Sequence, residues 1–415
     1  MDRQRKYLMA ASAFVLSFPA VVMAADSFDS LGAALSGGTP NVEARARWEH
    51  AEQENPTLDI ANAYTLRARV GYTTKKWNEL NLLTEFSGTF AYGPQAYNSG
   101  TNGKSRYATI GDPKGTQLNQ FALDYTGLAG NDFKIGRQRL ILDNQRFVGN
   151  SDWRQSEVTF DAFSAVNTQL PKTKLTYAYL ARVNDKNFTN YQLSGHLFNA
   201  GYAAAPQINL VGYAYLLDFA NNAAATKCGA VGATQRCDSQ TYGLRATGTF
   251  AFDAVKLIYT AEYAHQNHYG EAPGSVNAGY YLTEFGAISH GVTAKLGYED
   301  MQGDGKYSFQ TPLATLHLYD GWADMFLNTP AKGLRDAYLR VDGDAPWGIK
   351  LVGVYHDFRI DEGHDKLGTE MDLQAVKSIN KNLGVMVKYA EFRSSTNASP
   401  LFDTRKAWVQ AQYKF

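Results

Sequence analysis

The residues Val42-Glu43-Ala44-Arg45-Ala46-Arg47-Trp48-Glu49 alternate strictly between apolar and charged side chains. Successive side chains of a β-strand point to opposite faces of the sheet, so this segment predicts a strand with one apolar and one charged face. Two architectures accommodate such a strand. In a soluble sandwich the apolar face packs in the core, whereas in an outer-membrane barrel it faces lipid and the charged face lines a wet lumen.

The same alternation recurs along the chain and predicts about eighteen strands, each close to the ~9–11 residues that a tilted bilayer crossing requires. The predicted strands span residues 41–49, 63–72, 80–91, 117–126, 133–140, 157–168, 174–183, 191–202, 208–218, 241–250, 255–266, 278–287, 292–300, 335–342, 348–358, 368–377, 383–393 and 404–415. No linker or change of composition divides them, so we expect one continuous domain.

The connections between these strands sort by length. Those after even-numbered strands are short, for example 73–78 and 127–132, whereas those after odd-numbered strands are mostly long, for example 92–116 and 301–334, with 184–190 as the brief exception. Short turns at one end and long loops at the other are typical of outer-membrane barrels, and a sandwich has no cause to produce them. We therefore predict an all-β fold: a transmembrane antiparallel β-barrel with short periplasmic turns and long extracellular loops.

Both ends of the chain agree with this fold. Basic residues near the N-terminus precede an apolar run over residues 7–22, and a small-residue cleavage site follows at Ala24. This pattern predicts a secretory signal peptide over 1–24, which leaves 25–415 as a single barrel domain of the cell outer membrane. The last strand ends in Phe415 and resembles the terminal signal that outer-membrane barrels present to the barrel assembly machinery.

The composition narrows the partners. The formal net charge is zero, and it is −2 once residues 1–24 are removed, so bulk charge predicts neither a nucleic-acid nor a membrane-surface partner. We expect membrane lipid as a partner because of the predicted barrel. Aromatic residues make up 13% of the chain, which suits the girdles at a bilayer interface. Cys228 and Cys237 flank a short segment, and in an oxidising compartment this spacing predicts one disulfide that closes a loop. We predict no metal site and no cofactor.

The polar face of the strands predicts a lumen with many charges. The arginines on it are Arg45, Arg47, Arg67, Arg69, Arg182, Arg245 and Arg340, and its acids include Glu85, Asp124 and Asp161. One interpretation is an ordinary wet wall in which these charges pair. The other is that the arginines of the first two strands form a positive track for carboxylates or phosphates, because a planar guanidinium binds a carboxylate through two hydrogen bonds.

Two long connections carry more than surface residues. Residues 137–156 are dense in arginine and amide side chains, and residues 309–336 contain Trp322, Asp324 and Phe326. Large apolar side chains are costly to leave in water. The second connection therefore either packs on the barrel mouth or folds inward as a lid or constriction.

Several motifs resemble the alginate export family: Ile135-Gly136-Arg137-Gln138-Arg139, Gln145-Arg146-Phe147-Val148-Gly149, Thr159-Phe160-Asp161-Ala162, Phe309-Gln310-Thr311-Pro312 and Gly321-Trp322-Ala323-Asp324. The resemblance covers essentially all of the mature chain. It implies a monomeric eighteen-stranded outer-membrane barrel, and the best-known member of the family passes the polyuronate alginate through an arginine-lined constriction. A further motif of the resemblance is Trp153-Arg154-Gln155. By position in these motifs, the resemblance implies that Arg137, Arg139 and Arg154 are constriction arginines, with Asp161 as an acidic neighbour.

These observations together predict a passive outer-membrane channel for anionic sugars, organic acids or an exported polysaccharide such as alginate. The first alternative is a general or differently selective porin that passes sugars, organic acids or hydrophobic compounds. The others are a barrel enzyme and an adhesion barrel that works through its loops. The chain has neither a Gly-x-Ser-x-Gly nor a His-Glu-x-x-His motif, so we predict no catalytic residues.

Overall fold

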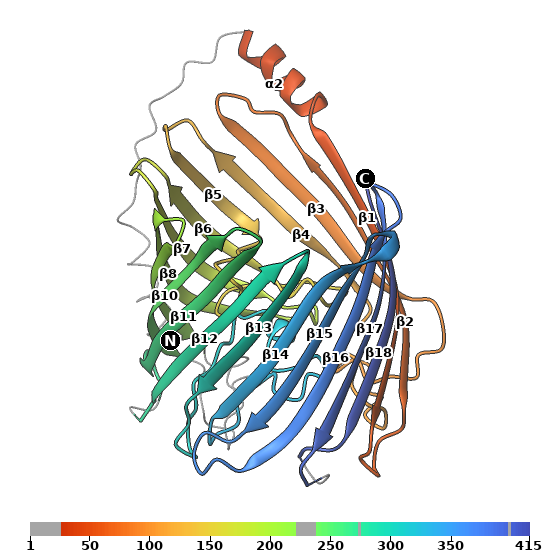
Figure 1. Ribbon diagram of the computed structural model, residues 1–415. Helices are drawn as coiled ribbons and strands as arrows, with labels where there is room; N and C mark the ends of the chain where they lie inside the picture. The colour runs from red at the N-terminus through yellow and green to blue at the C-terminus, as the bar shows by residue number, and fades with distance from the viewer. Residues whose placement is uncertain (1–25, 221–237, 273–274, 397–399) are drawn as a thin grey trace.

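The computed structural model describes residues 26–220, 238–272, 275–396 and 400–415, and these form one antiparallel β-barrel of eighteen strands (Figure 1). Each strand pairs with its neighbours in sequence, and β1 also pairs with β18, which closes the sheet. The C-terminal residue extends this seam, because the backbone N–H and C=O of Phe415 both bond to Val42. The predicted signal peptide and the predicted Cys228–Cys237 disulfide lie outside the described residues.

The elements are α2 (Asp26–Ser36), β1 (Thr39–Gln53), β2 (Ala61–Thr73), β3 (Leu80–Ala91), β4 (Gly115–Tyr125), β5 (Asn131–Gln138), β6 (Thr159–Asn167), β7 (Thr173–Asn184), β8 (Asn190–Ala205), β9 (Ile208–Phe219), β10 (Ser239–Phe252), β11 (Val255–His268), β12 (Asn277–Ser289), β13 (Val292–Met301), η2 (Leu316–Leu318), β14 (Leu334–Ala345), η3 (Pro346–Gly348), β15 (Ile349–Arg359), β16 (Lys366–Ser378), β17 (Leu383–Ser394) and β18 (Thr404–Lys414). The predicted strands and the predicted fold class are confirmed.

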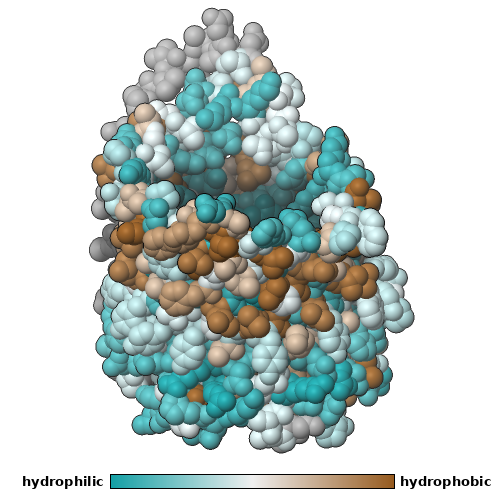
Figure 2. Space-filling model, viewed as in Figure 1, coloured by the Kyte–Doolittle hydropathy of each residue, from teal (hydrophilic) through white to brown (hydrophobic). Residues whose placement is uncertain are grey.

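The two faces of the wall differ as the alternation predicted. In β2, Arg67 and Arg69 are buried on the inward face, whereas the next residue, Val70, is exposed on the outward face, where lipid covers it. Leu296 in the middle of β13 is 66% exposed for the same reason, because lipid and not protein covers it. Figure 2 shows the result as an apolar band across the face formed by β11–β16.

The short-turn end of the barrel carries a helix that we did not predict. The β2–β3 turn contacts α2, since the backbone N–H of Lys75 donates to Ala34 O (3.0 Å) and Trp77 Nε1 donates to Ser30 Oγ (3.0 Å). Above the apolar band in Figure 2, at this same end, the barrel opens in a hollow lined with hydrophilic residues. Among the described residues, no helix has the length and apolar character needed to cross a membrane.

Substituting Leu296 by arginine tests which face meets lipid. Placing this charge at mid-strand on the outward face is expected to lower the free energy of unfolding by about 2–4 kcal/mol. Urea unfolding in phospholipid vesicles measures the change. The matched control is Lys295→Arg, because the neighbouring Lys295 lies on the inward face, 3.7 Å from Glu284. Equal effects of the two substitutions would contradict the assignment of the faces.

Candidate functional site: a constriction of the lumen

Two long connections fold into the barrel and meet there. The first inward loop, residues 139–158, joins β5 to β6, and the second inward loop, residues 302–333, joins β13 to β14 (Figure 1). Val148 and Leu313 form a β-bridge between them, and the backbone N–H of Ser151 donates to Thr315 Oγ1 (3.0 Å). Of the two interpretations of residues 309–336, the inward constriction is the one that the structure supports.

The arginines of β1 and β2 hold the first inward loop. Arg45 Nη1 donates to the carbonyl oxygen of Asp152 (2.8 Å), and Arg47 Nη2 donates to that of Trp153 (2.7 Å). A loop inside a barrel must still satisfy its backbone polar groups, and these guanidinium groups do so. The predicted track is therefore present on the wall, but Arg45, Arg47, Arg67 and Arg69 are all at most 5% exposed beneath the loop.

The carboxylate of Asp152 lies among three of these arginines. Arg67 Nη1 donates to its Oδ1 (2.7 Å), Arg69 Nη1 lies 2.9 Å from Oδ1, and Arg45 Nη2 lies 3.2 Å from Oδ2. We call these four residues the carboxylate cradle. Burial alone would raise the pKa of Asp152, but the three guanidinium groups, Arg67 most strongly, hold that pKa well below its ordinary value.

Arg154 ties the two inward loops to each other and to the wall. Its Nη1 donates to both carboxylate oxygens of Glu49 (3.1 Å each), and its Nη2 donates to Asp324 Oδ2 (2.8 Å). Asp324 also lies 3.0 Å from Lys406 Nζ and 2.6 Å from His317 Nδ1. Burial opposes ionisation of Asp324, but these cations outweigh it and its pKa falls well below the ordinary value.

Aromatic rings complete the contact between the loops. The ring of Trp153 stacks on that of His317 with 4.2 Å between the centroids, and the guanidinium of Arg47 lies 4.2 Å from the same indole. Lys388 Nζ lies 4.2 Å from the same indole and 3.5 Å from that of Trp322. Cation–π contacts of this kind stabilise charges that burial has stripped of water.

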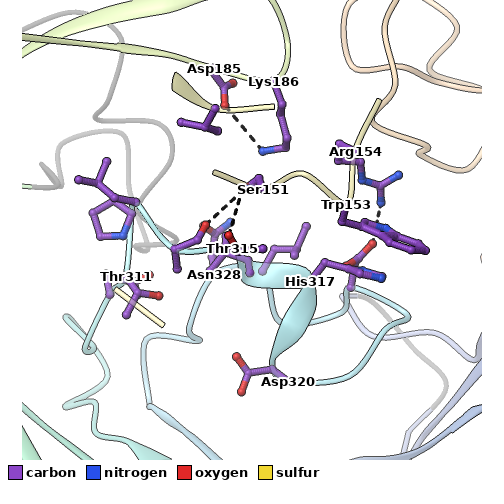
Figure 3. A pocket seen from close by; sticks show the side chains of 18 of the residues that line it. Ser151, Trp153, Arg154, Asp185, Lys186, Thr311, Thr315, His317, Asp320 and Asn328 are labelled. Carbon is purple, nitrogen blue, oxygen red and sulfur yellow. Dashed lines mark hydrogen bonds and ion pairs between the residues drawn. The ribbon is translucent and has the colours of Figure 1, made fainter. Parts of the chain in front are cut away.

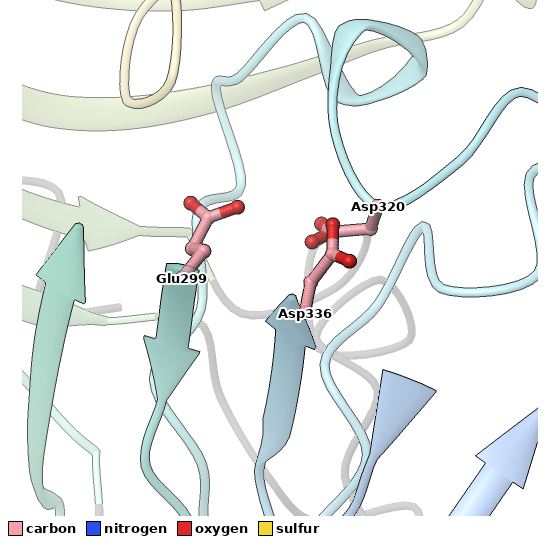
Figure 4. A group of neighbouring side chains, drawn as sticks. All are labelled: Glu299, Asp320 and Asp336. Carbon is pink, nitrogen blue, oxygen red and sulfur yellow. The ribbon is translucent and has the colours of Figure 1, made fainter. Parts of the chain in front are cut away.

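A buried acidic group supports the second inward loop. Oxygen atoms of Glu299, Asp320 and Asp336 all lie within 4.8 Å of one another (Figure 4). Arg146 already binds two of them, because its Nε donates to Glu299 (2.6 Å) and its Nη2 to Asp320 (3.0 Å). Burial raises the pKa of Asp320 to about 8, and repulsion by Glu299 and Asp336 adds to the effect against the attraction of Arg146.

A cavity of about 260 Å³ lies between the two loops and the β7–β8 connection. Figure 3 shows polar side chains around it, among them Ser151, Lys186, Thr311 and Asn328, together with the face of Trp153. The cavity therefore offers hydrogen-bonding groups, charges of both signs and aromatic rings to a small molecule in the lumen.

Most of the other predicted site residues also lie on the inward face or in the inward loops. Arg139 donates to Glu157 (2.7 Å) and to Glu85 (2.6 Å) next to the first loop. The remaining pairs belong to the wall alone: Arg245 with Glu262, Arg340 with Asp342, and Asp124 with Lys134. Trp322, Asp324 and Phe326 are buried within the second inward loop.

Arg137, Asp161 and Arg182 are corrections to the prediction. The register pairs Arg137 with Phe121, which is 50% exposed on the outward face, and with Asp161, which in turn pairs with Arg182. Residues that face each other across a ladder share a side of the sheet, so these three point away from the lumen. Arg139 reaches the lumen because the chain leaves β5 after Gln138 and turns inward.

For several residues of the constriction, the sequence predicted the face of the strand but not the contact. Glu370, Asp372 and Lys388 lie on the polar face that the alternation assigned to the lumen, and Glu370 and Asp372 of β16 accept from the backbone N–H groups of Ala323 (2.6 Å) and Trp322 (3.1 Å). Lys406 and His317 were not among the residues predicted to line the lumen. The alternation in β16, β17 and β18 shows which of their residues face inward, but no local pattern indicates which loop those residues contact.

The fold and the inward loops define an outer-membrane channel of the porin type. A sequence model of the alginate export family matches residues 41–301, more than half of the chain, and the protein belongs to that family. This places it in the bacterial outer membrane. The comparison with curated proteins gave no match.

Solved structures share the architecture. OccAB2 of Acinetobacter baumannii has a TM-score of 0.73 at 15% identity, with 92% of this chain and 99% of that chain covered. OccK9 (OpdG) of Pseudomonas aeruginosa has a TM-score of 0.71 at 14% identity, and OpdK of the same organism, solved with vanillate, has 0.68 at 14%, each with the same coverage. At these identities the likeness establishes the fold. Family and neighbours are channel proteins and not enzymes.

Removing the carboxylate of Asp152 is expected to widen the lumen. Asp152→Ala leaves three buried guanidinium groups without their shared partner, so the first inward loop loses its anchor and single-channel conductance rises several-fold. Recordings in planar bilayers measure this. Asp124→Ala is the matched control, since Asp124 pairs with Lys134 on the wall and not with a loop. Unchanged conductance in Asp152→Ala would show that Asp152 does not hold the loop in place.

The raised pKa of Asp320 predicts a dependence on pH. A carboxyl group whose pKa is raised on folding stabilises the folded arrangement at low pH, and this contribution is lost as the pH rises through about 8. Ionised Asp320 is repelled by Glu299 and Asp336, so we expect current fluctuations to increase as the pH passes about 8. Asp320→Asn should abolish that increase, and a variant that keeps it would assign the effect to another group.

Proposed function

We propose that the protein is a passive channel for small anionic solutes that carry carboxylate groups, such as uronic acids and other organic acids. The observation that carries the proposal is the carboxylate cradle, in which three arginines of the wall hold a carboxylate at the constriction. A solute carboxylate at this position would meet the same donors as Asp152. Arginine suits this task because it stays charged and binds a carboxylate through two donors.

Neighbouring acids would keep the attraction weak enough for release. Glu157 lies 3.2 Å from Arg69 and accepts from Arg139, and Glu49 neutralises Arg154. A channel must bind its solute strongly enough to admit it and weakly enough to let it leave. Alternating cations and acids along one wall would provide such a balance, because each guanidinium already has a carboxylate partner with which a solute carboxylate must compete.

The size of the solute follows from the two inward loops. They narrow the lumen and are held by ion pairs on both sides, at Asp152 and at Asp324. A monomeric acid can pass beside them, whereas a polysaccharide such as alginate requires them to move. OpdK, which shares the fold, was solved with vanillate, a small carboxylate, and this supports the smaller class. Membership of the alginate export family supports the polyuronate as the second candidate.

Reversal potentials in planar bilayers under a salt gradient test the selectivity. We expect the protein to prefer anions, and Arg67→Gln with Arg69→Gln to lower the anion-to-cation permeability ratio because two charges of the cradle are gone. Arg340→Gln is the control, since Arg340 pairs with Asp342 on the wall. Preference of the unaltered protein for cations would overturn the proposal.

Uronate added to the same bilayers distinguishes the two candidate solutes. Block by the monomer supports a small-solute channel, and block only by oligomers supports passage of the polymer. An absence of block by either, with anion preference retained, assigns the channel to other anions and rejects both uronate classes.

A further inference from the structure

The outward face of the barrel carries a charged group that the channel does not use. Arg137 Nε donates to Asp161 Oδ1 (2.7 Å), and its Nη2 donates to Oδ2 (3.2 Å). Asn184 Nδ2 donates to the same carboxylate (2.9 Å), and Arg182 Nε lies 3.8 Å from it. We call Arg137, Asp161 and Arg182 the outer arginine cluster. A charged group on a wall that otherwise faces hydrocarbon requires a polar partner outside the protein.

The cluster lies where the strands leave the bilayer. β5 ends one residue after Arg137, β6 begins two residues before Asp161, and β7 ends two residues after Arg182. The ends of β5 and β6 continue into the long first inward loop, and the end of β7 pairs with the start of β6, so all three belong to the extracellular side. On the same face, Phe121 lies beside Arg137 in the register, and Ile135, which is 59% exposed, lies two residues nearer the middle of the wall.

Aromatic residues on the adjacent strands mark the same boundary. The rings of Tyr179 in β7 and His196 in β8 lie 5.2 Å apart on the outward face, three residues or fewer below Arg182 along the sheet. Amphipathic rings of this kind gather at the level of lipid headgroups. Arg182 therefore lies at headgroup level, and its side chain is 39% exposed.

The cluster has one positive charge in excess. Two guanidinium groups share one carboxylate, and Asp161 is already engaged by both donors of Arg137. Another charged group on the outward face has a different balance. On β17, β18 and β1, Arg393 and Arg405 pair with Glu391, and Glu52 also lies within 3.9 Å of Arg405. These two arginines and two glutamates have no net charge. A third carboxylate, Glu54, lies 3.5 Å from Arg405, and with it the group has one negative charge in excess.

We propose that the outer arginine cluster binds the phosphate group of a phosphorylated glycolipid of the outer leaflet. The guanidinium groups of Arg137 and Arg182 surround the same carboxylate, and such a pair suits a phosphate, which accepts hydrogen bonds from several donors at once. The apolar surface formed by Phe121, beside Arg137, and Ile135, below it, accommodates the acyl chains of the same lipid. The headgroup and the acyl chains thus bind to adjoining parts of one surface. A free anion lacks acyl chains and would contact only the charged part.

Binding of bis-phosphorylated lipid A to the purified protein in neutral detergent tests this site. Native mass spectrometry gives the affinity of the first bound lipid. We expect Arg182→Gln to weaken it about tenfold, the weight of one charge-assisted hydrogen bond. Asp161→Asn should strengthen it, because neutralising the carboxylate leaves both guanidinium groups free for phosphate. Arg393→Gln in the neutral-to-acidic group is the matched control and should bind as the unaltered protein does.

Two further probes separate the lipid from its parts. Dephosphorylated lipid A should bind weakly and equally to all variants, and inorganic phosphate at the same phosphate concentration should not displace lipid A. Heat-modifiable migration on gels confirms that each variant is a folded barrel. Equal affinity of Arg182→Gln and Arg393→Gln for lipid A would overturn the proposal, and so would displacement by inorganic phosphate, which would make the cluster a site for free anions.

Discussion

The hydrogen bonds from the arginines of β1 and β2 to the first inward loop are the interaction on which the constriction depends. A chain segment that crosses a lumen has no sheet or helix ladder to satisfy its backbone, so its carbonyl groups need donors from the wall. Arg45 and Arg47 supply them at Asp152 and Trp153. Because arginine carries five donors on a planar fork, one side chain can bind a carbonyl and a carboxylate together. The loop and the wall therefore define each other's geometry.

The interior can hold so many charges because nearly every one has a partner of opposite sign. Arg154 is buried between Glu49 and Asp324, and Arg146 is buried between Glu299 and Asp320. Burying an isolated charge costs on the order of several kcal/mol, whereas an ion pair with good hydrogen bonds offsets much of that free energy. The same arrangement makes the constriction sensitive, because the loss of any one partner leaves a buried charge uncompensated.

The barrel could be predicted from the sequence because each strand is identified by a pattern within about a dozen consecutive residues. Alternation over a dozen residues identified β3 as residues 80–91, the bounds that it has, and the sorting of connection lengths gave the topology. The constriction could be predicted only as an inward loop. Its contacts join residues far apart in the chain, 85 positions in the pair Arg67 and Asp152, and no local pattern encodes such a pairing.

The correction at Arg137 has the same origin. Arg137 and Arg139 share a motif and a parity, and the motif suggested a shared role. The strand ends between them at Gln138, so alternation applies to Arg137 and places it outward, while Arg139 follows the turn of the loop into the lumen. The helix α2 was missed for a different reason, because the short segment Asp26–Ser36 follows the apolar leader and has no strand alternation of its own.

Asp152 already fills the carboxylate cradle, and this explains how the proposed channel could select anions and still conduct them. A vacant site with three guanidinium groups would bind an anion tightly and release it slowly. In the cradle, Asp152 already fills that position, so an entering carboxylate exchanges with one that is present, and the bonds formed resemble the bonds broken. The net free energy of such an exchange would be small, and the three guanidinium groups would favour anions over cations at this position. In the proposed channel, selectivity would then arise from the sign of the charge, and throughput from the competition of the loop's own carboxylate.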